Sequence, residues 1–187
     1  MGIQLIPAPV KVSQGTTPTC WAACTTSWLT VNKDRPQMNM KQLVDRYGDP
    51  KKKGGITFQD PGWKELMKAM RWTNTLIVQV VGTKAAGHAG SQLTLIELAD
   101  TIEETLFTRG YILLVDNHTS GTPLSQPISH MYVVYGITQT GDGGYEMLVM
   151  DPSPSHQARV TVGSFLNHHI ALIGALEKKA VASKSLP

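Results

Sequence analysis

Apolar residues recur every three or four positions in four stretches of the chain, which is the spacing of a helix with one buried face. The first stretch follows Thr19 as its predicted N-cap, and the third has Asp60 as cap and Pro61 at its first helical position. Before the fourth stretch, Thr94 and Glu97 have the spacing of a capping box. The predicted helices span residues 20–31, 39–47, 61–72 and 94–108.

The period changes from helical to extended after Gly110, where short runs rich in branched and aromatic residues alternate with turn residues. A Gly-Asp-Gly-Gly turn at 141–144 joins two of these runs into a hairpin. Strands are predicted at 76–81, 111–116, 129–140, 145–151, 159–162 and 170–177, with one helical turn at 164–169 and loops at 83–92 and 119–127. Helices come first and antiparallel strands second, so we expect the α+β class.

The length of 187 residues is that of one domain. We expect an extended lead-in at 1–13, a folded domain at 14–177 and a disordered tail at 178–187. The 41% hydrophobic and 17% charged fractions are typical of a globular protein. A formal net charge of +3 is too small to indicate a nucleic-acid surface, and the one basic run, at 51–53, precedes two glycines and is typical of a solvated loop.

No run approaches the 18 apolar residues of a membrane-spanning helix. The first ten residues, MGIQLIPAPV, lack the basic region and apolar run of a Sec signal peptide. We therefore expect no membrane contact, and a location either in the cytoplasm or outside it after export by a specialised secretion system.

His130 opens the first strand of the predicted hairpin, and Asp151 closes the second. If the turn has an even number of residues, the two side chains lie on the same face, directly opposite or one diagonal step apart. A bulge at Gly143 or Gly144 would spoil this arrangement. A carboxylate so placed can fix the tautomer of the imidazole and stabilise the imidazolium.

The two cysteines, Cys20 and Cys24, are too few for a disulfide framework, and a disulfide one helical turn apart would distort the helix. At the N-terminus of a helix, the Cys20 thiol is expected to have a lowered pKa. Acyl transfer also needs donors for the developing oxyanion. The backbone N–H of Cys20 and the side-chain amide of Gln14 are candidates.

These residues resemble the motifs of the papain-like cysteine peptidases. The matching segments are Gln14-Gly15, Cys20-Trp21-Ala22, His130 followed by Val133-Val134 and Gly136, and Asp151-Pro152. The order Gln, Cys, His, Asp is the family's order, and the resemblance covers residues 5 to 176. Asp151 in place of the usual Asn is more similar to the compact bacterial branch, which includes the AvrRpt2-type effector peptidases and C39-like domains.

The resemblance implies a papain-like fold over 14–177, with the nucleophile helix packed on the C-terminal sheet. It implies that Cys20 is the nucleophile, His130 the general base and acid, Asp151 the orienting residue and Gln14 an oxyanion-hole donor, with no metal or cofactor. The expected function is a cysteine peptidase that cleaves a peptide or isopeptide bond, as a monomeric bacterial effector or toxin domain. Its partners would be a protein or peptide substrate and an immunity protein or activating partner.

The sequence is also compatible with other functions and with other roles for some residues. The same triad could serve a deamidase, a transglutaminase-like enzyme or a cell-wall amidase, and the scaffold could be a non-catalytic peptide-binding domain. Cys24 is typical of a core residue, and His118 is the strongest rival of His130 as base. The adjacent His168 and His169 could hold a metal ion, but no third ligand stands at a recognisable spacing. The remaining histidines, His88 and His156, also compete.

Overall fold

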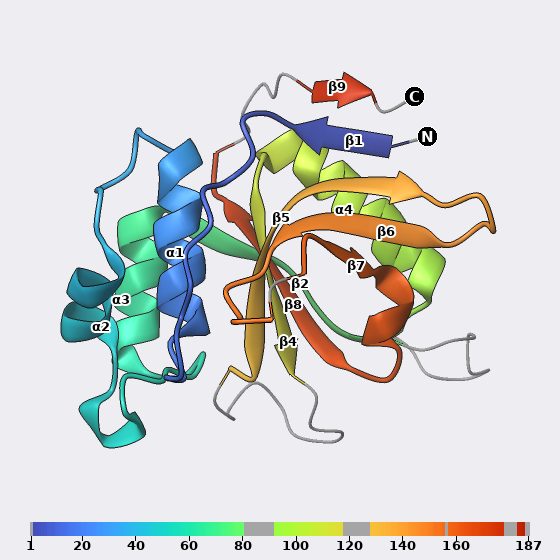
Figure 1. Ribbon diagram of the computed structural model, residues 1–187. Helices are drawn as coiled ribbons and strands as arrows, with labels where there is room; N and C mark the ends of the chain where they lie inside the picture. Colours follow the sequence, from blue (N-terminus) through green and yellow to red (C-terminus); the bar gives the residue numbers. More distant parts are fainter. Residues whose placement is uncertain (1, 81–91, 118–127, 156, 178–182, 186–187) are drawn as a thin grey trace.

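The computed structural model describes residues 2–80, 92–117, 128–155, 157–177 and 183–185 (Figure 1). Its helices are α1 (Cys20–Val31), α2 (Met40–Tyr47), α3 (Pro61–Met70) and α4 (Leu95–Arg109), with short 3-10 turns η1 (Pro50–Lys52) and η2 (Val162–Phe165). Its strands are β1 (Gly2–Leu5), β2 (Trp72–Val80), β3 (Gln92–Leu93), β4 (Ile112–Asn117), β5 (His130–Gln139), β6 (Tyr145–Met150), β7 (Arg159–Thr161), β8 (His169–Ala175) and β9 (Ser183–Ser185). Across these ranges, every helix is too short or too polar to cross a membrane.

The strands of the described residues form one sheet, in the order β3-β2-β8-β4-β5-β1-β9, and β6 and β7 continue from β5. All pairs are antiparallel except β2 with β3. Along one edge, the first half of β5 pairs with β4 and the second half pairs with β1. Along the other edge, β5 pairs with β6. Strand β5 therefore connects most of the sheet, and its first residue is His130.

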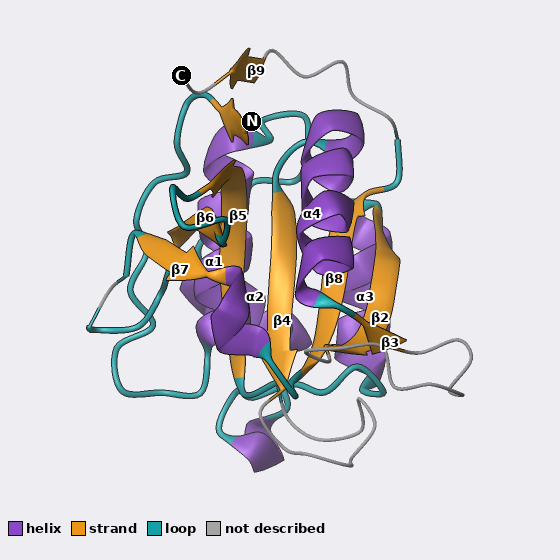
Figure 2. Cartoon of the chain, turned by 90° about the vertical axis from the view of Figure 1, so that its right-hand side faces the viewer, coloured by secondary structure: helices purple, strands orange, loops and turns teal. Residues whose placement is uncertain are grey.

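Helices cover both faces of the sheet. Figure 2 shows α4 in front of β4 and β8, with α1, α2 and α3 behind the strands. One core lies between the first three helices and the sheet and includes Met131 and Val133 of β5. A second core lies under α4 and includes Val134 and Ile137. The α+β class is confirmed, but α4 lies on the face opposite to the other helices. Strand β1 was not expected, and β2 begins at Trp72 rather than at the predicted Leu76.

Two of the three predicted caps differ from expectation. Thr19 is the N-cap of α1, but its side chain makes no capping hydrogen bond, because its hydroxyl bonds the hydroxyl of Thr17 at 2.7 Å. Asp60 also makes no cap bond and instead accepts from Lys52 and the N–H of Thr57. The box of Thr94 and Glu97 is confirmed. The third helix ends at Met70, before the predicted Trp72, because Arg71 takes a left-handed φ of 51° and Trp72 opens β2.

The hairpin of β5 and β6 places residues 130 and 151 on one face as predicted, but a bulge in β5 and not the turn is the cause. Five residues, 140–144, separate the strands, so near the turn Thr138 lies opposite Glu146 and the predicted parity is wrong. A bulge at Tyr135 then shifts the register by one residue, and Val133 lies opposite Met150. The bulge restores the parity that places residues 130 and 151 on the same face.

Both ends of the described chain add strands to the sheet. The lead-in is extended, but Gly2–Leu5 pair with β5 as β1, and Leu5 is fully buried. Ser183–Ser185, which the sequence places in a disordered tail, pair with β1 as β9. The predicted loop at 119–127 lies outside the described residues. The predicted loop at 83–92 also lies outside them, except for Gln92, which is the first residue of β3.

Candidate active site

Cys20 is the first residue of α1, and its thiol lies against the first residues of β5. The side chain is buried, with 3% of the residue exposed. The backbone N–H of Met131, the residue after His130, is among the groups that act to lower the pKa of the Cys20 thiol. One turn further along α1, the Cys24 thiol donates to the carbonyl oxygen of Met131 at 3.0 Å. The Cys24 thiol therefore joins the first turns of α1 to the residue of β5 that follows His130.

The pKa of the Cys20 thiol is raised, and the predicted lowering is wrong. Burial raises it to about 11, although the backbone N–H groups of Trp21, Cys20 and Met131 act in the opposite direction. Burial likewise raises the pKa of Cys24 well above its ordinary value. The helix terminus does provide donors, as expected, but they do not outweigh the loss of water around the thiol. In the free chain the thiol is therefore protonated at neutral pH.

His130 and Asp151 meet as predicted. The Nε2 atom of His130 lies 2.9 Å from Oδ1 of Asp151, and the carboxylate also accepts from the N–H and hydroxyl of Ser153 and the N–H of Gln157. Burial alone would raise the pKa of the Asp151 carboxyl, but these hydrogen bonds hold it well below its usual range. Asp151 is thus an ionised acceptor. Because a carboxylate only accepts, Nε2 carries the hydrogen and the lone pair of the neutral ring is on Nδ1.

The thiol and the His130–Asp151 pair lie within electrostatic reach but are not hydrogen-bonded to one another. The charge of Asp151 is among the causes that raise the pKa of Cys20 and Cys24. Among the described residues, no hydrogen bond joins the Cys20 sulfur to the imidazole of His130. Tyr132 packs edge-on against that imidazole, with ring centroids 4.5 Å apart. The structure therefore contains an oriented imidazole near a buried, protonated thiol.

Gln14 is connected to the same loop as Asp151. Its backbone N–H donates to the carbonyl oxygen of Pro152 at 2.9 Å, and its side-chain Nε2 donates to Thr17 at 3.4 Å. The other amide atom, Oε1, is buried and has no hydrogen-bond partner in the described part of the chain. A half-turn of the amide would exchange the two atoms and place the N–H₂ donors at that buried position. The structure thus places Gln14 between the segment before Cys20 and the segment after Asp151.

The other histidines divide into those outside and those inside the described residues. His88, His118 and His156 lie outside them, so the rivalry between His118 and His130 is not decided. His168 bonds Asp116 through Nδ1 at 3.0 Å, and Nδ1 of His169 is buried without a partner among the described residues. Within the same residues, no group of three or more His, Cys, Asp or Glu side chains is arranged to hold a metal ion.

Some groups of the site were not found from the sequence. The N–H of Met131 acts on the pKa of the Cys20 thiol, but a backbone group carries no signal in the sequence. Ser153 holds both oxygens of Asp151, and its position two residues after an Asp is a recognisable turn signal. Asp116 directly follows four apolar residues of β4, which is a signal for a buried carboxylate.

Comparison of the chain with models of protein families and with curated proteins finds no match to either.

The raised pKa of Cys20 predicts slow alkylation at neutral pH. Because the thiolate is the nucleophile, the rate of labelling by iodoacetamide should rise with pH through about 11 rather than through the ordinary thiol value. Cys24, which is fully buried, should label more slowly still. Labelling each cysteine over a pH series, resolved by mass spectrometry, measures both rates. Rapid labelling of Cys20 below pH 7 would instead mean that a thiolate–imidazolium pair exists in the free chain.

Proposed function

We propose that the chain is a thiol hydrolase of the papain-like kind, a cysteine peptidase that acts on a peptide or isopeptide bond. The observation that carries the proposal is the 2.9 Å contact of His130 Nε2 with Asp151, at the start of the strand against which the first turn of α1 packs. A buried carboxylate that orients an imidazole beside a helix-terminal thiol is the arrangement that nucleophilic acyl transfer needs.

In the proposed reaction, Nδ1 of His130 takes the thiol proton as the Cys20 sulfur attacks the carbonyl carbon. The oxygen becomes an oxyanion, which the N–H of Cys20 and the amide of Gln14 stabilise. The C–N bond then breaks, and the imidazolium gives its proton to the leaving amine. Water, deprotonated by His130, hydrolyses the thioester and releases the acid and the thiol. Asp151 stays ionised throughout and stabilises the imidazolium.

A protonated resting thiol is compatible with this sequence of steps. Proton transfer to His130 need only accompany attack, as in general-base catalysis, and no preformed ion pair is required. The buried thiol also has to turn toward the substrate. Substrate or partner binding is the event that we propose makes this turn favourable.

The test uses p-nitrophenyl acetate, an activated ester that requires no knowledge of the natural substrate. In the wild-type chain, we expect release of p-nitrophenolate and an acetyl group on Cys20, located by mass spectrometry of proteolytic fragments. Cys24→Ser is the matched control, since it also removes a buried thiol from α1 and should keep the reaction. Cys20→Ser should abolish the acetyl adduct. An adduct on Cys24 alone, or none in the wild type, would refute the proposal.

The class of bond is then decided by products from a peptide mixture. A peptidase produces two fragments from one peptide, whereas a deamidase leaves one peptide with an acid in place of an amide. A transglutaminase-like enzyme joins an added amine to the peptide. A peptide that binds equally well to wild type and Cys20→Ala without turnover would favour the binding-domain alternative.

A further inference from the structure

A second Asp–His pair lies beside the first and is not used in the proposed mechanism. Asp116 is 1% exposed near the end of β4, where the preceding residues of the strand are apolar and buried. A carboxylate in such a place is costly unless it is paired. Its Oδ1 lies 3.0 Å from Nδ1 of His168, the residue before β8, whose side chain is 24% exposed.

The sheet register brings this second pair next to His130. Asp116 of β4 lies directly opposite His130 of β5, so their side chains leave the same face of the sheet on neighbouring strands. Directly opposed Cβ atoms in an antiparallel pair are only about 5 Å apart. His130 is therefore flanked by two carboxylates, Asp151 through a hydrogen bond and Asp116 across the sheet.

Ring contacts provide an independent sign that the two pairs form one group. Tyr132 packs on His130, Phe165 packs on Tyr132 at 6.1 Å, and His168 packs on Phe165 at 6.2 Å. Burial, followed by the charges of Asp151 and Asp116, raises the pKa of Tyr132 well above its ordinary value. Both carboxylates thus act on a ring that touches the base.

We propose that Asp116 is a positioning residue for His130 that stabilises its protonated form across the sheet, and that His168 moderates this effect by sharing the carboxylate. The consequence for catalysis rests on the proposed function, in which His130 must hold a proton between attack and departure of the amine. The pairing itself does not depend on Cys20. The titratable groups around His130 are Cys20 of α1, Asp116 of β4, Tyr132 of β5, Asp151 after β6 and, through Asp116, His168 before β8.

The test is an NMR titration of the His130 ring protons in the full chain, assigned by their absence in His130→Ala. In Asp116→Asn, the midpoint of the titration should fall by about one pH unit, because a nearby negative charge favours the imidazolium. In His168→Asn, the midpoint should rise, because the variant removes the imidazole whose Nδ1 lies 3.0 Å from the Asp116 carboxylate. A residue with a merely structural role would not produce shifts in opposite directions.

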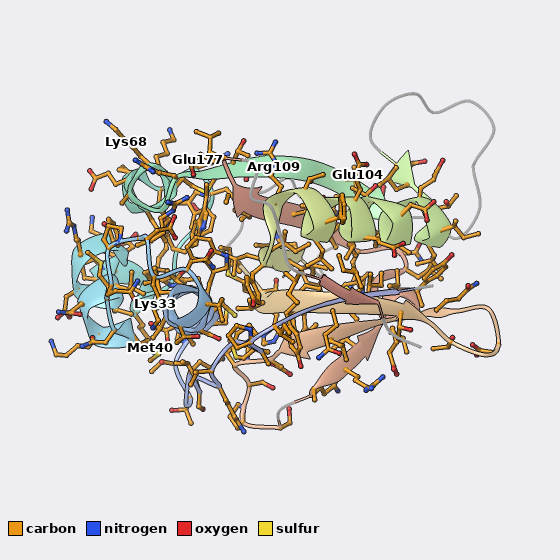
Figure 3. All side chains as sticks on the ribbon, turned by 90° about the horizontal axis from the view of Figure 1, so that it is seen from above. Lys33, Met40, Lys68, Glu104, Arg109 and Glu177 are labelled. Atoms are coloured by element: carbon orange, nitrogen blue, oxygen red, sulfur yellow. The ribbon has the colours of Figure 1, made fainter. Side chains whose placement is uncertain are left out.

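The charge control is Glu104→Gln on α4, which removes an exposed carboxylate that hydrogen-bonds to neither histidine and should leave the midpoint unchanged (Figure 3). If Asp116→Asn does not fold, His168→Asn alone still tests the proposal, since its side chain is partly exposed. A midpoint that is unchanged in either variant, or that moves the same way in both, overturns it. The titration needs neither turnover nor acetylation of Cys20, so its failure can be distinguished from a failure of the proposed function.

Discussion

Replacing His130 with alanine is expected to slow the acetylation of Cys20 by p-nitrophenyl acetate at least ~100-fold at neutral pH, the usual contribution of a positioned general base. Burial keeps the Cys20 thiol protonated, with a pKa of about 11. In this variant, attack therefore requires the small fraction of molecules in which the thiol is ionised. The loss should shrink as the pH rises toward that value, because the thiolate then forms without a base. Stopped-flow release of p-nitrophenolate over a pH series measures both effects.

Two controls separate lost chemistry from lost structure. Imidazole added to the buffer should restore part of the acetylation rate in His130→Ala, because that variant lacks only the base. It should restore none in Cys20→Ser, which lacks the nucleophile. The acetylation rate of Asp151→Asn should lie between those of wild type and His130→Ala, since the imidazole remains but loses its ionised acceptor. Equal rates for wild type and His130→Ala at neutral pH would exclude His130 as the base.

Replacing Trp28 with alanine is expected to lower the free energy of unfolding by about 3–5 kcal/mol, the usual cost of removing a buried aromatic ring. Trp28 is 1% exposed and packs edge-on against Trp72 of β2, with ring centroids 5.2 Å apart. Its Nε1–H donates to the carbonyl oxygen of Tyr111 at 2.9 Å, just before β4. The ring thus joins α1 to two strands of the sheet and helps to hold Cys20 at the start of β5.

Urea unfolding followed by tryptophan fluorescence measures this change as a lower midpoint at an unchanged slope. Trp28→Phe keeps a ring in contact with Trp72 but loses the hydrogen bond to Tyr111, so we expect it to cost only about 1–2 kcal/mol. A loss of less than about 1 kcal/mol in the alanine variant would mean that α1 does not depend on this contact.

Local patterns predicted the helices and most strands, because caps, apolar spacing and turn residues act over a few positions. Thr94 with Glu97 is an example, since both partners of the capping box lie within one turn. Thr19 and Asp60 show the limit of this reasoning: both stand at N-caps, yet each side chain bonds another partner. Strand β3 was missed because its two residues are defined by pairing with β2 and not by a pattern of their own.

The candidate site was predicted in part for the same reason. The pairing of His130 with Asp151 follows from the hairpin, although a bulge rather than the turn produces the parity. The raised pKa of Cys20 could not be predicted, because burial depends on how α1 packs on β5. The partnership of Asp116 with His168 joins residues 52 positions apart and needs the order of β4 and β8 in the sheet.

The bulge at Tyr135 also separates the tip of the β5–β6 hairpin from the site. Since the register changes at Tyr135, the side on which Asp151 emerges is set there and not at the turn. A side chain added at Gly141 would meet no atom within 4 Å. The tip can therefore accept a peptide tag or a fluorophore there, which provides a place for a reporter away from the candidate site.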